Sequence, residues 1–316
     1  MLLKIKGDKM RTKQIILVVT AVLILFSFST AIAQDLDKVQ ITSVKVTDNI
    51  YMLQGAGGNI GLSFGSDGIF IIDDQFAPLH EKLIAVIDEL TKGKVSESAN
   101  TFLLNTHFHF DHTGGNELLG KTGAVIMAHQ NVRKRLSVEM NIPFFKSTNP
   151  PVPEIGLPVI TFEQDITLYL NGDSVNIIYV GPAHTDGDAI VHFSKADVIH
   201  GGDILFTSSY PFIDMDNGGS VSGVIAAVEK ILKLAGDKTK IIPGHGDLTD
   251  KAGLESYRKM LSTIFESVSA MVADGKTLEQ IIASKPTADF DAQYDGFISN
   301  EAFLGLLYSD LTELKK

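Results

Sequence analysis

Three histidines and an aspartate stand within six residues of one another, directly after a short apolar stretch. Residues 105–115 read NTHFHFDHTGG, in which His107, His109, Asp111 and His112 form an HxHxDH pattern. The preceding residues 101–105 have the character of a buried strand. A tight turn after that strand aims alternate side chains the same way, so the first two histidines would share one metal ion, and Asp111 and His112 would reach a second. The pattern therefore favours a fold in which a strand ends at a metal centre.

Three later residues have the same setting. His184, Asp203 and His245 each follow a predicted strand and have glycines nearby, which let the backbone approach a shared site closely. Imidazole and carboxylate ligands suit zinc best, with iron and manganese as alternatives. The chain has no cysteine, so thiolate chemistry, disulfides and cysteine-based zinc sites are excluded.

Short strands followed by a helix occur twice along the chain. Residues 41–73 indicate an antiparallel meander of four strands, followed by a helix at 79–90 and the strand at 101–105. The second half repeats this order with strands near 159–162, 166–170, 174–180, 189–193 and 197–200, a helix at 221–234 and a strand at 240–243. This order predicts two similar layers packed face to face.

Two further regions complete the predicted organisation. Residues 141–158 contain five of the ten prolines and are predicted to form a long loop. From about residue 250 the chain is predicted to be helical, with helices at 251–273, 277–284 and 300–314. Thr277 and Gln280 have the spacing of a capping box at the start of the second of these helices.

The first 33 residues have the layout of a cleavable secretory signal. Residues 1–13 carry five basic side chains against one acid, residues 15–28 are mostly apolar, and residues 31–33 form an AxA site. The apolar run is short for a membrane span, so we expect cleavage after Ala33 and a periplasmic or secreted mature chain. An uncleaved anchor is the alternative. Either Met1 or Met10 is the start of the chain.

Net charge restricts the partners. The whole chain has a formal charge of −11, and loss of residues 1–33 removes five basic and one acidic side chain, which leaves a mature protein near −15. Such a charge repels nucleic acid phosphates and anionic membrane surfaces. We therefore expect a small-molecule substrate, no nucleic-acid partner and no membrane association after signal cleavage. The sequence does not indicate an oligomeric state.

The HxHxDH pattern and the three later residues, in this order, resemble the metallo-β-lactamase superfamily over about residues 44–246. The resemblance implies an α/β fold, the four-layer αββα sandwich, for residues 34–249, after a signal peptide at 1–33, with residues 250–316 as a helical extension packed on the same domain. It also implies two zinc ions: His107, His109 and His184 would bind the first, Asp111, His112 and His245 would bind the second, and Asp203 would bridge them. Asp73, at the end of a strand, matches a family acid that supports the ligand loop.

This site implies a dinuclear zinc hydrolase in which a metal-bound hydroxide attacks an ester, lactone, amide or thioester bond. Asp111 is the expected catalytic residue, because it can orient the hydroxide and later shuttle a proton. β-Lactamase activity and an iron-dependent oxidoreductase on the same scaffold are the alternatives. The diiron branch of the family typically has Glu where His109 stands, which disfavours the oxidoreductase. A metal-binding protein without turnover is a further alternative.

Departures from family patterns narrow the substrate. Residues 201–203 read GGD where one β-lactamase subclass has GGC, and Phe206 stands where that subclass has a lysine that grips the drug carboxylate. The GGDxLF form is more similar to the glyoxalase and lactonase branches. We expect an aromatic rim that favours an apolar acyl or ring group, made of Phe108, Phe110, Phe144, Phe145, Tyr210 and Phe212. The remaining histidines are predicted to be structural: His80 on the surface at a helix start, His129 at a helix start, and His192 and His200 within strands.

Overall fold

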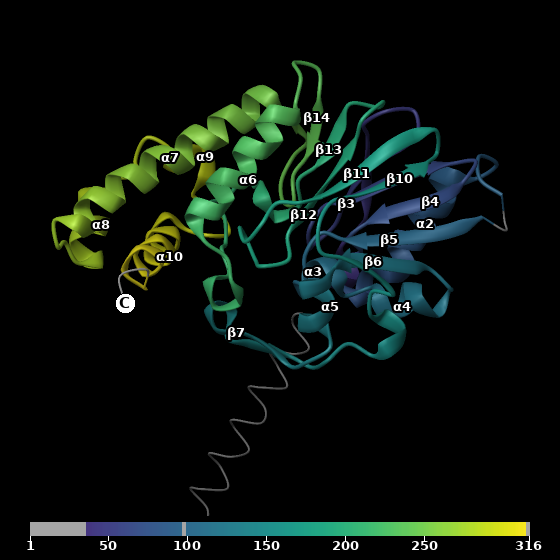
Figure 1. Ribbon diagram of the computed structural model, residues 1–316, viewed down its shortest axis with the longest axis horizontal. Coiled ribbons are helices and arrows are strands. Elements are labelled where there is room, and N and C mark those ends of the chain that lie inside the picture. The colour runs from purple at the N-terminus through teal and green to yellow at the C-terminus, as the bar shows by residue number, and fades with distance from the viewer. Residues whose placement is uncertain (1–35, 97–98, 314–316) are drawn as a thin grey trace, which may run out of the picture. The chain divides into compact units, whose positions relative to one another are not determined.

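The computed structural model describes residues 36–96 and 99–313. The predicted signal segment, residues 1–33, lies outside the described residues. Residues 41–316 form one compact unit, and every strand of the described residues belongs to it (Figure 1). Within the described residues, no helix is both long enough and apolar enough to cross a membrane.

The first sheet has seven strands in the order β1-β2-β3-β4-β5-β6-β9. The strands are β1 Thr42–Lys45, β2 Ile50–Gln54, β3 Ile60–Gly65, β4 Gly68–Ile72, β5 Asn100–Asn105, β6 Val125–His129 and β9 Ile160–Phe162. The first four form the predicted antiparallel meander, whereas β4, β5, β6 and β9 pair in parallel. Because parallel neighbours need a crossover, helices separate these strands: α2 His80–Thr91, α3 Phe110–Thr113, α4 Asn116–Lys121 and α5 Gln130–Leu136.

Two parts of this sheet differ from the prediction. The sequence pattern does not indicate β6 or α4, and of α5 it indicates only the start at His129. The strand predicted near 159–162 belongs to the first sheet, not to the repeat in the second half, because β9 pairs with β6. Both differences have one cause: the crossover through α5 brings residue 160 back beside residue 127, and pairing over that distance leaves no local signal.

The second sheet has six strands in the order β10-β11-β12-β13-β14-β15. Their bounds are β10 Ile166–Leu170, β11 Asp173–Tyr179, β12 Ala189–Phe193, β13 Val198–His200, β14 Lys240–Ile242 and β15 Thr249–Asp250. Only β13 and β14 pair in parallel, and α6 (Val221–Leu234) is the crossover between them. Ser220 caps α6 by accepting a hydrogen bond from the backbone N–H of Gly223.

Three hydrophobic clusters establish the layers. One contains Met52 and Phe70 from the first sheet and Val191 and Phe193 from the second, so it lies between the sheets. Another joins the second sheet to α6 and the C-terminal helices. A smaller cluster joins Ala128 of β6 to Val132 and Leu136 of α5, so helices also cover the first sheet. The observed order of layers is helices, sheet, sheet and helices, which confirms the predicted αββα fold with additional C-terminal helices.

The C-terminal helices are α7 Lys251–Ala273, α8 Leu278–Ser284, α9 Asp291–Tyr294 and α10 Asn300–Glu313. In Figure 1 they lie on the same side of the sheets as α6, and the buried apolar residues of α7 and α10 share one cluster with those of α6. The capping box of Thr277 and Gln280 is present, as predicted. The short α9 is not indicated by the sequence pattern.

The proline-rich segment 141–158 has more structure than the predicted long loop. It contributes to a small hairpin of β7 (Met140–Ile142) and β8 (Ser147–Asn149), with a 3₁₀ turn at Pro143–Phe145 between them. Lys146 closes this turn in the left-handed conformation, at a φ of 51°. A second 3₁₀ turn, Glu154–Gly156, leads into β9.

Candidate metal centre

The seven predicted ligands lie where strands end. His107 and His109 follow β5, and Asp111 and His112 stand in the one-turn helix α3 that comes next. The other three come from the second sheet, with His184 after β11, Asp203 in the 3₁₀ turn after β13 and His245 after β14. The two sheets therefore bring segments more than 130 residues apart to one place.

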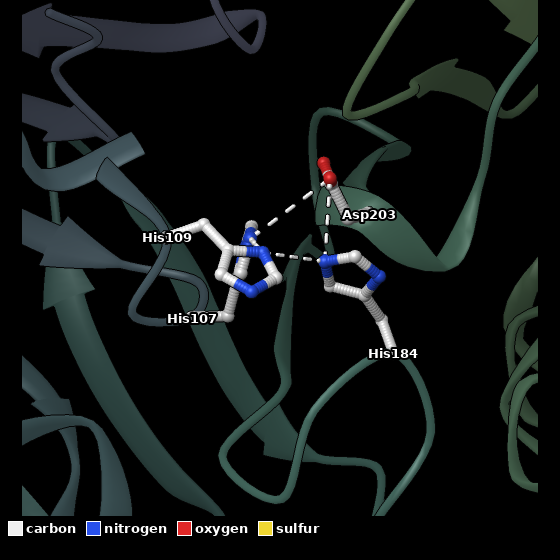
Figure 2. A group of neighbouring side chains, drawn as sticks. All are labelled: His107, His109, His184 and Asp203. Carbon is white, nitrogen blue, oxygen red and sulfur yellow. Dashed lines mark hydrogen bonds and ion pairs between the residues drawn. The ribbon is translucent and has the colours of Figure 1, made fainter. Parts of the chain in front are cut away.

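Four of these side chains form a buried group, which we call the inner site: His107, His109, His184 and Asp203 (Figure 2). Nδ1 of His109 lies 3.1 Å from Nε2 of His107 and 2.9 Å from Nε2 of His184. Oδ2 of Asp203 lies 3.9 Å from Nε2 of His107 and 3.4 Å from Nε2 of His184. One ligand atom from each of the four lies within 4.8 Å of the others.

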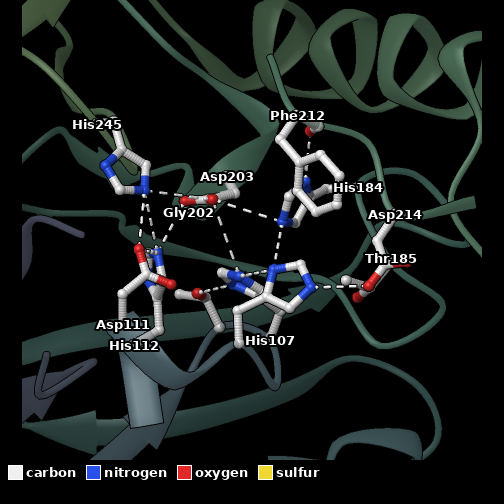
Figure 3. Close-up of polar contacts among 12 residues, drawn as sticks. His107, Asp111, His112, His184, Thr185, Gly202, Asp203, Phe212, Asp214 and His245 are labelled. Atoms are coloured by element: carbon white, nitrogen blue, oxygen red, sulfur yellow. Dashed lines mark hydrogen bonds and ion pairs between the residues drawn. The ribbon is translucent and has the colours of Figure 1, made fainter. Parts of the chain in front are cut away.

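The remaining three side chains, Asp111, His112 and His245, form a second group that we call the outer site. The Nε2 atoms of its two histidines are 3.4 Å apart, and Oδ2 of Asp111 lies 3.6 Å from the first and 3.3 Å from the second. Asp203 faces this group as well, because its Oδ1 is 3.1 Å from Nε2 of His112 and its Oδ2 is 3.4 Å from Nε2 of His245 (Figure 3). Asp203 is thus the residue that the two sites share.

The outward nitrogens of three histidines are engaged by acceptors. His184 donates from Nδ1 to the carbonyl oxygen of Phe212 at 2.8 Å. His112 donates from Nδ1 to Oδ2 of Asp73 at 2.8 Å, and His109 donates from Nε2 to Oδ2 of Asp214 at 2.9 Å. A histidine that binds a metal ion is neutral and has one N–H, so with that proton on the outward nitrogen the inward nitrogen of each ring has its lone pair free for a metal ion.

This arrangement fits a metal ion. Lone pairs of neighbouring imidazoles that point at one spot repel each other unless a cation lies among them, and fixing the proton on the outer nitrogen is how proteins orient histidine ligands. The buried Oδ1 of Asp203 also makes no hydrogen bond of regular geometry among the described residues, although Nε2 of His112 lies 3.1 Å away. Nitrogen and carboxylate donors without sulfur fit zinc, and also iron or manganese.

Asp73 supports both the ligand loop and one ligand. It follows β4, and its Oδ1 accepts the backbone N–H of Thr106 at 2.7 Å while its Oδ2 accepts the Thr106 hydroxyl at 2.7 Å as well as His112. Because the Thr106 hydroxyl donates its hydrogen bond to Asp73, its oxygen can accept a hydrogen bond from Nδ1 of His107 at 3.1 Å. Asp73 has a left-handed backbone, at a φ of 63°. The adjacent Asp74 instead accepts the N–H of Gly115, so the supporting acid expected from the resemblance is Asp73.

Asp214 is a functional residue that the sequence reasoning missed. Its Oδ2 accepts hydrogen bonds from His109 and, at 2.8 Å, from Nδ2 of Asn217. Arg135 holds Asn217 through its side-chain and backbone oxygens and also makes a two-pronged ion pair with Asp186. The only sequence signal was position, because Asp214 lies two residues after Phe212 of the predicted aromatic rim.

Burial and charge shift the pKa values of histidines in the two sites in opposite directions. Burial holds the pKa of His107 well below its usual range and lowers the pKa of His184 to about 4. Burial also acts on His245, but the carboxylates of Asp203 and Asp111 outweigh it and raise the pKa to about 9. The pKa of His112 is raised in the same way. For Asp111, burial is outweighed by His112 and His245, which lower the pKa to about 2.

The other four histidines lie outside both sites. His129 caps α5 by accepting the N–H of Asn131, and His192 and His200 lie within β12 and β13, as predicted. Nε2 of the buried His200 bonds to the carbonyl oxygen of Asn59 at 3.2 Å. His80 does begin α2, but it is buried and does not lie on the surface as predicted.

The prediction of an aromatic rim is wrong for two of its six members. Phe108 is fully buried in a cluster with Val132 and Leu136, because alternation along the chain turns it away from His107 and His109 and into the core. Tyr210 is also fully buried, and its hydroxyl donates to Oδ1 of Asp291 at 2.9 Å. The other four aromatic residues remain near the surface or beside the ligands: Phe110, Phe144, Phe145 and Phe212.

Comparison with known proteins points in the same direction as the geometry. Residues 95–245 match the family model described as the metallo-beta-lactamase superfamily. The chain is 23% identical over 209 residues to "Metallo-beta-lactamase type 2" of Bacteroides fragilis, which covers 65% of this chain and 78% of that protein. It is also 23% identical over 242 residues to the protein of the same name from Elizabethkingia meningoseptica, which covers 73% and 88%.

Two solved structures with the same fold cover different shares of this chain. The crystal structure of DIM-1 metallo-beta-lactamase has a TM-score of 0.56 at 19% identity and covers 72% of this chain and 99% of its own. The sec-alkylsulfatase Pisa1 from Pseudomonas sp. has a TM-score of 0.63 at 14% identity and covers 88% of this chain and 51% of its own. Coverage of 88% of this chain is possible only if the match includes part of the helices after residue 250. The C-terminal helices therefore also have a structural counterpart.

Proposed function

Because the chain is a hydrolase of the metallo-beta-lactamase superfamily with a histidine and aspartate metal site, we propose that it is a dinuclear zinc enzyme. Its substrate is a small molecule with an ester, lactone, amide or thioester bond beside an apolar group. The observation that carries the proposal is the position of Asp203, whose carboxylate lies within 3.9 Å of imidazole nitrogens from both sites.

The residues divide the work between them. When bound, a pair of zinc ions supplies a Lewis acid for the substrate carbonyl and a hydroxide at neutral pH. Asp203 sets the separation of the two sites. Asp111, which is anionic because its pKa lies near 2, accepts a hydrogen bond from the attacking water, orients it and takes up its proton. Its side chain is 20% exposed, so it can pass that proton to solvent or to the leaving group.

Metal analysis tests the proposal most directly. Purified protein is expected to carry close to two ions per chain, predominantly zinc, because seven ligands converge. A stoichiometry that stays at one under zinc saturation would mean that the outer site does not form. Iron as the dominant ion would favour the oxidoreductase alternative. Metal binding without turnover on any ester, lactone or β-lactam would favour the third alternative, a metal-binding protein.

The substrate class follows from Phe206. Its ring stacks on His245 with centroids 5.0 Å apart, and it stands where β-lactamases of one subclass have a lysine for the drug carboxylate. Loss of one charge-assisted hydrogen bond to the substrate lowers kcat/KM by about one to two orders of magnitude. Uncharged lactones and esters are therefore expected to have higher kcat/KM values than penicillins or cephalosporins.

β-Lactamase activity is the second candidate, because the relatives with similar sequences carry that name. A panel of lactones and chromogenic esters, measured beside the cephalosporin nitrocefin on one preparation, separates the two. A nitrocefin kcat/KM that exceeds every ester and lactone would reverse the order of the candidates. The metal assignment does not depend on this outcome.

The same proposal includes export. Residues 1–33 have the composition of a cleavable signal, so the mature protein is expected to begin at Gln34 and to be periplasmic or secreted. With a charge near −15 it has no nucleic-acid partner and no membrane association after cleavage. N-terminal sequencing of exported material checks this, and a start upstream of residue 28 would contradict it.

A further inference from the structure

Four phenylalanines from three segments form a continuous row beside the inner site, which we call the aromatic wall: Phe144, Phe145, Phe212 and Phe297. The ring of Phe212 lies 5.7 Å from the ring of His109 and 5.8 Å from that of His184. Phe144 and Phe145, at the tip of the β7–β8 hairpin, lie 5.0 Å and 4.7 Å from Phe212. The wall therefore begins at the metal ligands themselves.

The outermost member comes from the C-terminal extension. Phe297 precedes α10, and its ring stacks on Phe145 with centroids 6.0 Å apart and an interplanar angle of 28°. It is 82% exposed, whereas its neighbour Ile298 is 2% exposed. A phenylalanine ring left in water forgoes the free energy of burying its apolar surface.

The backbone around Phe297 is held on both sides by the loop that follows Asp203. The N–H of Ile298 donates to Oγ of Ser209 at 2.9 Å, and the carbonyl oxygen of Tyr294 accepts the N–H of Tyr210 at 2.7 Å. The chain passes so close at Gly296 that a Cβ there would lie 2.5 Å from the carbonyl oxygen of Ser208. The exposed ring is thus presented by a fixed segment.

We propose that the aromatic wall binds the apolar part of the substrate, an aliphatic chain of medium length or a hydrophobic ring, and that Phe297 is a specificity-determining residue. The proposal deepens the function proposed above and rests on it. Two observations support this occupant: the row is continuous with rings that touch the metal ligands, and its exposed end is aromatic and uncharged. The C-terminal helices would then contribute to the site as well as to the core.

Two metal-binding probes with one head group test the wall. Acetohydroxamic acid and octanohydroxamic acid present the same chelating group and differ only in chain length, so the ratio of their Kd values reports contacts of the chain alone. Calorimetric titration of the zinc-loaded mature protein is expected to show octanohydroxamic acid binding at least about tenfold more tightly, because each fully buried methylene strengthens binding about fourfold. Phe297→Ala is expected to reduce that ratio about three- to fivefold and to leave the Kd of acetohydroxamic acid unchanged.

Tyr169 provides a matched control, since it is also 82% exposed but lies in β10 of the second sheet. Tyr169→Ala should leave the ratio unchanged. An unchanged ratio in Phe297→Ala, or an equal fall in both variants, would overturn the proposal. A normal ratio in a protein that hydrolyses no ester, lactone, amide, thioester or β-lactam would leave the wall intact and refute the hydrolase function. Failure of acetohydroxamic acid to bind the wild type would refute the zinc centre and the wall together.

Discussion

The inner and outer sites contain similar ligands but differ in what surrounds them. In the inner site His107, His109 and His184 have side chains no more than 5% exposed, and each donates from its outer nitrogen to a protein acceptor. In the outer site Asp111 is 20% and His245 is 30% exposed, and His245 rests on the face of Phe206. In the proposed dinuclear centre, the inner site would hold its ion tightly and the outer site would give water and substrate access to the second ion.

Removing Asp203, the residue that the two sites share, should disable both sites at once. Asp203→Ala is expected to reduce hydrolysis by several orders of magnitude, because it deprives both sites of a ligand and no longer fixes their separation. Turnover of the most active ester or lactone is the measurement, and circular dichroism checks that the fold is intact. Unchanged turnover would show that Asp203 is not a ligand.

Removing one histidine from each site in turn should show which site holds its ion more tightly. After dialysis, His184→Ala, which lacks the tight inner site, is expected to retain well below one ion per chain, whereas His245→Ala should retain close to one. In the wild type, dialysis against a chelator should remove one ion well before the other. Metal content by atomic emission measures all three proteins, and equal loss from both variants would mean that the sites do not differ in affinity.

The two supporting acids allow a smaller and matched perturbation. Asp214→Asn should weaken the inner site and Asp73→Asn the outer one, each by about 10- to 100-fold in metal affinity, which is the usual effect of losing a partner of a ligating histidine. Asparagine is nearly isosteric and tolerates the left-handed backbone of residue 73. Competition with a fluorescent zinc chelator measures both affinities. The assignment of acid to site is wrong if the two variants weaken the same ion.

Proton release on metal binding is a further expected difference between the two sites. At pH 7 the metal-free protein has a protonated His245, whose pKa is about 9, and a neutral His184, whose pKa is about 4. A metal ion must displace the proton from the first residue but not from the second. Affinity at the outer site should therefore fall about tenfold per pH unit and per proton as the pH decreases from 8 to about 6, while His184 adds no such dependence at the inner site. Calorimetry in buffers with different ionisation enthalpies counts the protons released.

The sequence predicted the convergence of these seven side chains because they obey a local rule. Each follows a strand, and strand ends in two packed sheets converge, so His184, Asp203 and His245 could be joined to the HxHxDH pattern without a structure. Asp214 could not, since it contacts His109 across 105 residues from a loop without a distinctive pattern. Phe108 and Tyr210 were misplaced for a related reason: composition shows that aromatic residues are present near a site but not which way they point.

The fold, like the site, was predicted where the signal is local and missed where it depends on distant residues. Helices with a clear apolar face, such as α6 and α7, were predicted at their observed bounds. The short β6 and the partnership of β9 were not, because the stability of a strand depends on neighbours distant in the sequence. The C-terminal segment around Phe297 shows the same limit, since its anchoring to Ser209 and Tyr210 arises only after both sheets have formed.

The left-handed backbone of Asp73 has a consequence for how related chains can diverge. The position needs a residue that tolerates positive φ and also a carboxylate short enough to reach Thr106 and His112 together. Glycine meets the first demand only, glutamate carries the charge on a longer side chain and a less tolerant backbone, and asparagine keeps the shape but turns one acceptor into a donor. No single substitution satisfies both demands. Evolution can therefore exchange the loops that select a substrate while this position stays fixed, and a lineage that loses Asp73 is expected to lose its second metal before it loses its fold.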